Sequence, residues 1–143
     1  MSFVESLAPL SGRLVLAWYF LSQAYRYAID WNNTAILLSM RNIPIPTIML
    51  ASIVAATVLA SVSLLLGFRA RAGAAVLLLI TLALSVTLHD FWHLRAAIAR
   101  NADYDIFARN VAIAGGLLMV IGLGAGALAL DNAGGRRGRR RSR

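Results

Sequence analysis

Three long stretches of the chain carry no charged side chain: residues 42–68, 72–89 and 110–130. They are rich in leucine, alanine, valine and isoleucine, and a helix needs about 20 mostly apolar residues to cross a bilayer core. Each stretch therefore predicts one membrane-spanning helix. The predicted spans are residues 47–68, 72–89 and 106–130.

A fourth predicted span comes first in the chain, at residues 9–29. It is apolar and aromatic, and its charges are Arg13 and Arg26. These lie about 20 Å apart on a helix that rises about 1.5 Å per residue, so each guanidinium can reach an opposite membrane interface. A signal peptide is the alternative interpretation, but the lead-in contains Glu5 and no basic residue, which disfavours it.

The connecting segments are short. Residues 30–46 predict an interfacial connector anchored by Trp31, and proline disfavours helix in the residue before it, so the chain should be extended before Pro46 and helical after it. Residues 67–73 suffice only for a tight turn, which makes the second and third spans antiparallel neighbours. We expect an all-α protein, an integral membrane four-helix bundle over residues 1–131, with a disordered basic tail at 132–143.

Composition supports a membrane protein and excludes several chemistries. The chain is 59% hydrophobic and 14% charged, which is too apolar for a soluble surface of this size. Its 143 residues leave little room for a separate catalytic domain, and it has no cysteine. Disulfides, thiolate metal sites and iron–sulfur clusters within the chain are therefore excluded.

Arginine distribution predicts the orientation. All 14 basic residues are arginine, and six of them lie in the tail. Arg69 and Arg71 lie in the tight turn, which four spans place on the tail's side, so the positive-inside rule predicts that both termini are cytoplasmic. Attraction to anionic membrane lipids explains the basic tail without nucleic-acid binding.

Small residues predict where helices pack closely. Ser52, Ala56 and Ala60 share one face of the second span, and Gly122 with Gly126 forms a GxxxG pair in the fourth. Contacts within the bundle explain both patterns, and a homo-oligomer interface is the alternative.

Polar residues collect at the predicted non-cytoplasmic boundary. Thr81, Ser85, His89 and His93 follow one another at four-residue steps, which places them on one helix face. The first span ends and the last begins at the same boundary. The candidate cluster comprises Arg26, His89, Asp90, His93, Arg109 and Asn110.

Three roles remain open for this cluster. It could be an interfacial ion-pair group, a quinone or proton site, or, through His89 and His93, a weak metal or haem site. The metalloprotease pattern HExxH is absent, since Asp90 follows His89. At the opposite boundary, a structural ion pair is expected between Asp131 and the arginines of that side, Arg13, Arg69 and Arg71.

The order of these landmarks resembles the DoxX family of small four-helix membrane proteins. The resemblance rests on Arg13 and Arg26 in the first span, Pro44 and Pro46 in the connector, and four sequence blocks. The blocks are LLGFRARAGA at 65–74, HDFW at 89–92, FARNVAIAGGLL at 107–118 and GAGALALD at 124–131. The place near Thr57 carries a glutamate in many members of that family, and Arg26 stands where lysine is usual.

That resemblance implies a bacterial inner-membrane protein associated with respiratory or sulfur-linked redox systems. We therefore expect an accessory subunit of a redox assembly, with a quinone or lipid site at the non-cytoplasmic boundary and no catalytic activity of its own. A quinone-dependent oxidoreductase subunit and a purely structural anchor for a protein partner are the alternatives. The expected partners are membrane lipids and a redox-complex protein, and a quinone is the candidate cofactor.

Overall fold

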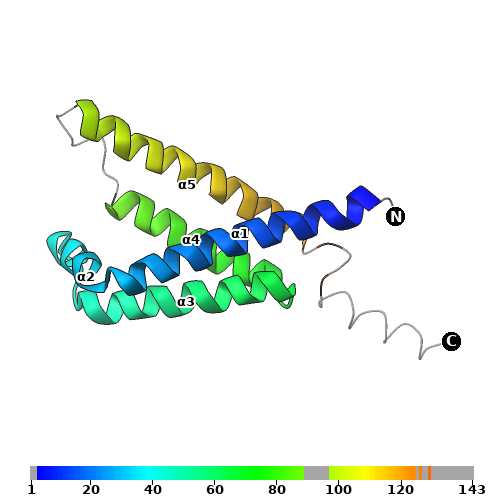
Figure 1. Cartoon of the computed structure of the whole chain (residues 1–143), viewed down its shortest axis with the longest axis horizontal. Coiled ribbons are helices and arrows are strands. Elements are labelled where there is room, and N and C mark those ends of the chain that lie inside the picture. Colours follow the sequence, from blue (N-terminus) through cyan, green and yellow to red (C-terminus); the bar gives the residue numbers. More distant parts are fainter. Residues whose placement is uncertain (1–2, 89–96, 125, 127–128, 130–143) are drawn as a thin grey trace.

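A computed structural model describes residues 3–88, 97–124, 126 and 129. These residues form five α-helices and no strand (Figure 1). The helices are α1 (Phe3–Ile29), α2 (Trp31–Met40), α3 (Pro46–Leu66), α4 (Ala70–Leu88) and α5 (Ala97–Leu123). The all-α prediction is confirmed, but the prediction of four helices is wrong.

The additional helix is α2, which occupies most of the segment predicted as an interfacial connector. Asp30 precedes it, and the Thr34 backbone N–H and hydroxyl both donate to the Asp30 carbonyl, at 3.0 and 2.9 Å. Leu38, 1% exposed, packs α2 against the rest of the molecule. Ten residues are too few for a span, so the hydropathy pattern alone did not distinguish this helix from a loop.

The chain turns from α2 into α3 through two left-handed residues. Asn42 has a φ of 56° and Ile45 a φ of 51°, and α3 then begins at Pro46. The prediction of an extended residue before Pro46 is therefore wrong. A reversal within five residues requires backbone conformations that an extended strand cannot supply.

A tight turn joins α3 to α4, as expected, and the two helices pack side by side. Gly67 ends α3 with a φ of 65°, and its N–H donates to the Leu64 carbonyl at 3.2 Å. A Cβ at Gly67 would meet the Arg13 guanidinium and Ala129. Glycine is therefore required here for two reasons: its φ is positive, and no space remains for a side chain.

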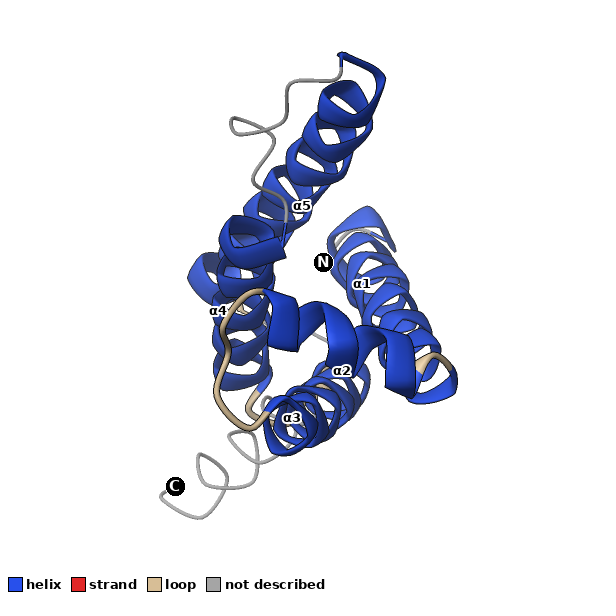
Figure 2. Cartoon of the chain, turned by 90° about the vertical axis from the view of Figure 1, so that its left-hand side faces the viewer, coloured by secondary structure: helices blue, strands red, loops and turns tan. Residues whose placement is uncertain are grey.

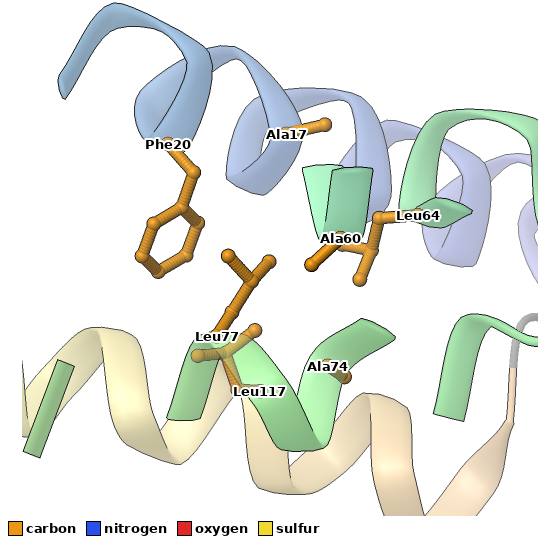
Figure 3. Close-up of a cluster of buried hydrophobic side chains, with 7 residues drawn as sticks. All are labelled: Ala17, Phe20, Ala60, Leu64, Ala74, Leu77 and Leu117. Carbon is orange, nitrogen blue, oxygen red and sulfur yellow. The ribbon is translucent and has the colours of Figure 1, made fainter. Parts of the chain in front are cut away.

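The hydrophobic core joins four helices. Figure 3 shows its seven buried side chains, which α1, α3, α4 and α5 contribute: Ala17, Phe20, Ala60, Leu64, Ala74, Leu77 and Leu117. A Cβ on Gly73 would lie 2.9 Å from the Ala60 carbonyl oxygen, so α3 and α4 approach closely at this point. The small-residue prediction therefore holds at Ala60.

The GxxxG prediction for the last span is confirmed only at Gly126, where a Cβ would lie 2.7 Å from the Pro9 Cβ of α1, and the two glycines do not share one helix. α5 ends at Leu123, and Gly126 lies beyond it with a φ of 80°. A Cβ on Gly122 would meet nothing within 4 Å. The glycines here end the helix, because left-handed glycine at Gly124 and Gly126 stops it.

Within the described residues, three helices are long and apolar enough to cross a membrane: Pro46–Leu66, Ala70–Leu88 and Arg100–Leu123. They agree with three of the predicted spans. α1 is not among them, although it runs alongside α3 (Figure 1). Large apolar side chains on the outside of the candidate spans, such as Leu59, Leu79 and Leu123, form the surface that lipid chains would contact.

Candidate functional site

A cavity of about 690 Å³ lies at the end of the molecule where α2 is found. Figure 2 looks toward this end and shows α2 crossing in front of the longer helices, with α1 and α5 on opposite sides. α5 packs mainly on α4 and contacts α1 little. The separation of α1 and α5 leaves space between them, and residues of all five helices line the cavity. Its volume is within the range of small-molecule sites.

The cavity's charged wall combines three arginines with two acids: Arg26, Asp30, Arg41, Asp103 and Arg109. Arg26 lies in the last turn of α1, and Arg41 follows the last residue of α2. The Arg41 Nη2 donates to the carbonyl oxygen of Leu88 at 3.2 Å, so its positive charge lies at the C-terminal end of α4, where the helix dipole favours a cation.

Arg26 on α1 and Arg109 on α5 both line the cavity. Tyr27 lies close enough to both that each guanidinium acts on its phenol electrostatically. Among the described residues, neither side chain has an ion-pair partner. The two guanidinium groups are therefore available to a negatively charged ligand at this mouth of the cavity.

The inner wall is largely uncharged. Its apolar side chains include Phe20, Leu37, Ile80, Leu84 and Ile106. Aliphatic and aromatic walls with a few placed polar groups are typical of sites for amphipathic molecules.

Neutral polar side chains interrupt this wall at defined places. Asn110 donates from Nδ2 to the Ser85 Oγ at 2.7 Å, which links α5 to α4. Thr81 donates to the Leu77 carbonyl at 2.7 Å, and the Gln23 Nε2 donates to the Tyr19 hydroxyl at 3.0 Å. Thr57 on α3 is 3% exposed and lines the same cavity.

The structure brings together half of the predicted cluster. Arg26, Arg109 and Asn110 line one cavity. His89, Asp90 and His93 lie outside the described residues, so their part in the cluster stays a prediction. The first two members of the predicted polar stripe, Thr81 and Ser85, are buried on α4.

Several lining residues were not selected from the sequence. Arg41 and Asp103 lie at the same boundary as Arg26, and that position was the signal that could have identified them. Tyr19, Gln23 and Thr57 gave no such signal, because neutral side chains within apolar helices do not interrupt a hydrophobic run.

The arginines of the opposite end also converge. Arg13 is 2% exposed, and its Nε lies 3.4 Å from the Pro9 carbonyl oxygen. Arg71 from α4 reaches the end of α5, where a Cβ on Gly124 would lie 3.3 Å from its Nη2. Arg69 lies in the α3–α4 turn with a φ of 50°. Asp131 lies outside the described residues, so the predicted ion pair with these arginines stays a prediction.

A metal site finds no support in the part of the chain that is described. No group of three histidine, cysteine, aspartate or glutamate side chains there could hold an ion. The two candidate ligands, His89 and His93, are not among the described residues.

Apolar spans surrounding a cavity with an arginine-bearing mouth define a multi-pass α-helical membrane protein with a candidate ligand site. Residues 10–136 match the SURF4 family, and the chain belongs to that family. Comparisons with curated proteins and with solved structures give no match.

The DoxX resemblance is therefore wrong. The landmarks that suggested it are an arginine-bearing first helix, a proline connector and a tight glycine–arginine turn. They occur here in a chain of the SURF4 family, so they do not identify DoxX. The redox role followed from that resemblance and loses its support with it.

Proposed function

We propose that this protein binds an amphipathic membrane molecule that carries an anionic head group. The head group lies at the mouth of the cavity, between Arg26 and Arg109, and the apolar part lies against the inner wall. The observation that carries the proposal is one cavity that is lined by arginines of α1 and α5 together with aliphatic and aromatic side chains.

The location of the cavity supports a membrane lipid as the ligand. Three members of the charged wall, Arg26, Asp30 and Arg41, lie at the ends of α1 and α2, beside the C-terminal end of the candidate span Ala70–Leu88. Head groups lie at the ends of spans, and an arginine near an anionic membrane surface contributes about 1 kcal/mol of attraction. Exposed apolar side chains on both α1 and α5, such as Trp18 and Val111, allow lipid to approach the cavity from the side.

Binding can be tested on the full-length protein purified in mild detergent. Native mass spectrometry would measure the retention of added phosphatidylglycerol, which is anionic, phosphatidylcholine, which has no net charge, and a ubiquinone. We expect preferential retention of the anionic lipid. The double variant Arg26→Gln/Arg109→Gln should lower that retention by about a hundredfold or more, because each lost charge-assisted hydrogen bond contributes about 1.5–3 kcal/mol.

Arg100→Gln is the matched control, since Arg100 is an exposed arginine of α5 that does not line the cavity. It should retain wild-type binding. Retention of the quinone without the anionic lipid would contradict the proposed head-group chemistry. Retention of none of the three would leave a structural anchor for a protein partner as the function of this bundle.

A further inference from the structure

The cavity is also lined by threonines from inside two of its helices. Thr57 lies near the middle of α3, 11 residues after Pro46, which corresponds to about 17 Å along the helix. Thr81 on the neighbouring α4 lies seven residues before Leu88, or about 10 Å from the end of that helix. The cavity therefore extends from the charged mouth toward the middle of the candidate spans.

Thr57 differs from the other buried hydroxyl residues of these helices in its hydrogen bonding. Ser61 donates to the Thr57 carbonyl at 2.6 Å and Thr81 to the Leu77 carbonyl at 2.7 Å, so both are satisfied within their own helices. The Thr57 hydroxyl forms no hydrogen bond within the described residues, and Thr57 lines the cavity. A hydroxyl that lines a cavity without a protein partner can donate to an acceptor atom of a ligand.

The surroundings of Thr57 select an acceptor without charge. Phe20 and Ile80 line the same cavity from α1 and α4, and α3 itself carries no charged residue. A charged group would be costly to bury here, whereas a carbonyl oxygen can accept from a threonine hydroxyl at little cost. In a glycerolipid with an anionic head group, the neutral acceptors beneath the phosphate are the acyl-ester carbonyls.

We infer that Thr57 donates a hydrogen bond to an acyl-ester carbonyl of the bound lipid, so that the site recognises a glycerolipid at two levels. Arg26 and Arg109 hold the anionic head group, and Thr57 distinguishes an ester linkage from an ether linkage in the apolar part of the cavity. This inference rests on the proposed function, because it names the class of amphipathic molecule that the same cavity takes.

The experiment compares two lipids that differ only in this linkage. Full-length protein is titrated with diacyl phosphatidylglycerol and with its dialkyl-ether analogue, and binding is measured by native mass spectrometry. The wild type should prefer the ester by about fivefold, the effect of one ordinary hydrogen bond. Thr57→Val keeps the shape and removes the hydroxyl, so it should lose the preference while its affinity for the ether lipid stays unchanged. Thr57→Ser should retain the preference.

Thr47→Val is the matched control, because Thr47 is exposed at the start of α3 and does not line the cavity. Equal binding of the two lipids by the wild type, or an equal loss of both in Thr57→Val, would overturn the inference. The proposed function would survive either result if Arg26→Gln/Arg109→Gln still weakened both lipids. A lost ester preference in Thr57→Val, with no effect of the arginine substitutions, would instead contradict the head-group proposal and retain the role of Thr57.

Discussion

Single residues at the two ends of the molecule have different tasks. At the α2 end, arginines border a cavity, whereas at the opposite end Arg13 is buried where the α3–α4 turn meets α1. The buried guanidinium lies against Gly67, so the backbone of the turn and the charge of α1 depend on each other. A substitution at this contact should therefore affect folding rather than binding.

Gly67→Ala should lower the free energy of unfolding by about 1–3 kcal/mol. A Cβ is strained at a φ of 65° and would collide with the Arg13 guanidinium and with Ala129. Thermal unfolding in detergent, followed by intrinsic fluorescence, measures the effect. Gly122→Ala is the control, because its Cβ would meet nothing within 4 Å, and its stability should change by less than about 1 kcal/mol. An equal effect of both substitutions would contradict the contact.

The sequence pattern identified charged site residues, because they interrupt hydrophobic runs. It did not select neutral polar residues of the cavity wall, because they do not interrupt such runs. Arg26 and Arg109 stood out because a charge near a predicted span is costly unless it reaches a boundary. Thr57 was noted only because many members of the DoxX family carry a glutamate near that place, and nothing in the hydropathy of its helix marked it as a site residue. The role proposed for Thr57 depends on the side chains of α1 and α4 that line the same cavity. The order of residues along the chain does not show which helices surround a given position.

The helices differ in how visible they are in the sequence. α3 and α4 match the predicted spans closely because long apolar runs determine both. α5 begins nine residues before the predicted start, since its first turns are polar, and it ends earlier because glycines stop it. α2 was not predicted, because a ten-residue helix with one buried residue has no long apolar run that the hydropathy pattern could reveal.

Leu38 is that anchor, and Leu38→Ala should destabilise the protein by about 2–4 kcal/mol. The side chain is 1% exposed, so its truncation leaves a cavity as well as losing buried apolar area. Thermal unfolding measures the loss. Ile36→Ala, at a position that is 55% exposed on the same helix, should cost less than about 1 kcal/mol.

The position of α2 also matters for binding, because Thr34, Leu37 and Arg41 contribute to the cavity wall. Arg41→Gln removes the charge at the α4 terminus and should lower the retention of phosphatidylglycerol by about threefold to tenfold. Native mass spectrometry in mild detergent measures it. Wild-type binding by Arg41→Gln would contradict this prediction. It would mean that the α2 segment lines the cavity but that the Arg41 charge does not contribute to ligand recognition.

Orientation in the membrane is a property of the whole chain, and the helix arrangement makes a definite prediction about it. The beginning of α1 and the α3–α4 turn lie at the same end of the molecule, and α2 lies at the other (Figure 1). If α1 crosses the membrane together with the three apolar helices, the beginning of α1 and Phe68 face one side and Asn32 faces the other. The arginine distribution predicts that the side of Phe68 is the cytoplasm.

Single-cysteine labelling can test this without background, because the natural chain has no cysteine. In sealed spheroplasts of a bacterial expression host, a membrane-impermeant maleimide should label Asn32→Cys, and should label Ser2→Cys and Phe68→Cys only after the membrane is permeabilised. Phe68 and Asn32 are exposed, so a lack of reaction in intact cells reports sidedness rather than burial. Labelling of Ser2→Cys and Asn32→Cys from the same side would mean that α1 lies along the membrane instead of crossing it. The charged mouth of the cavity would then be bordered by an interfacial helix, and the three apolar helices alone would anchor the protein.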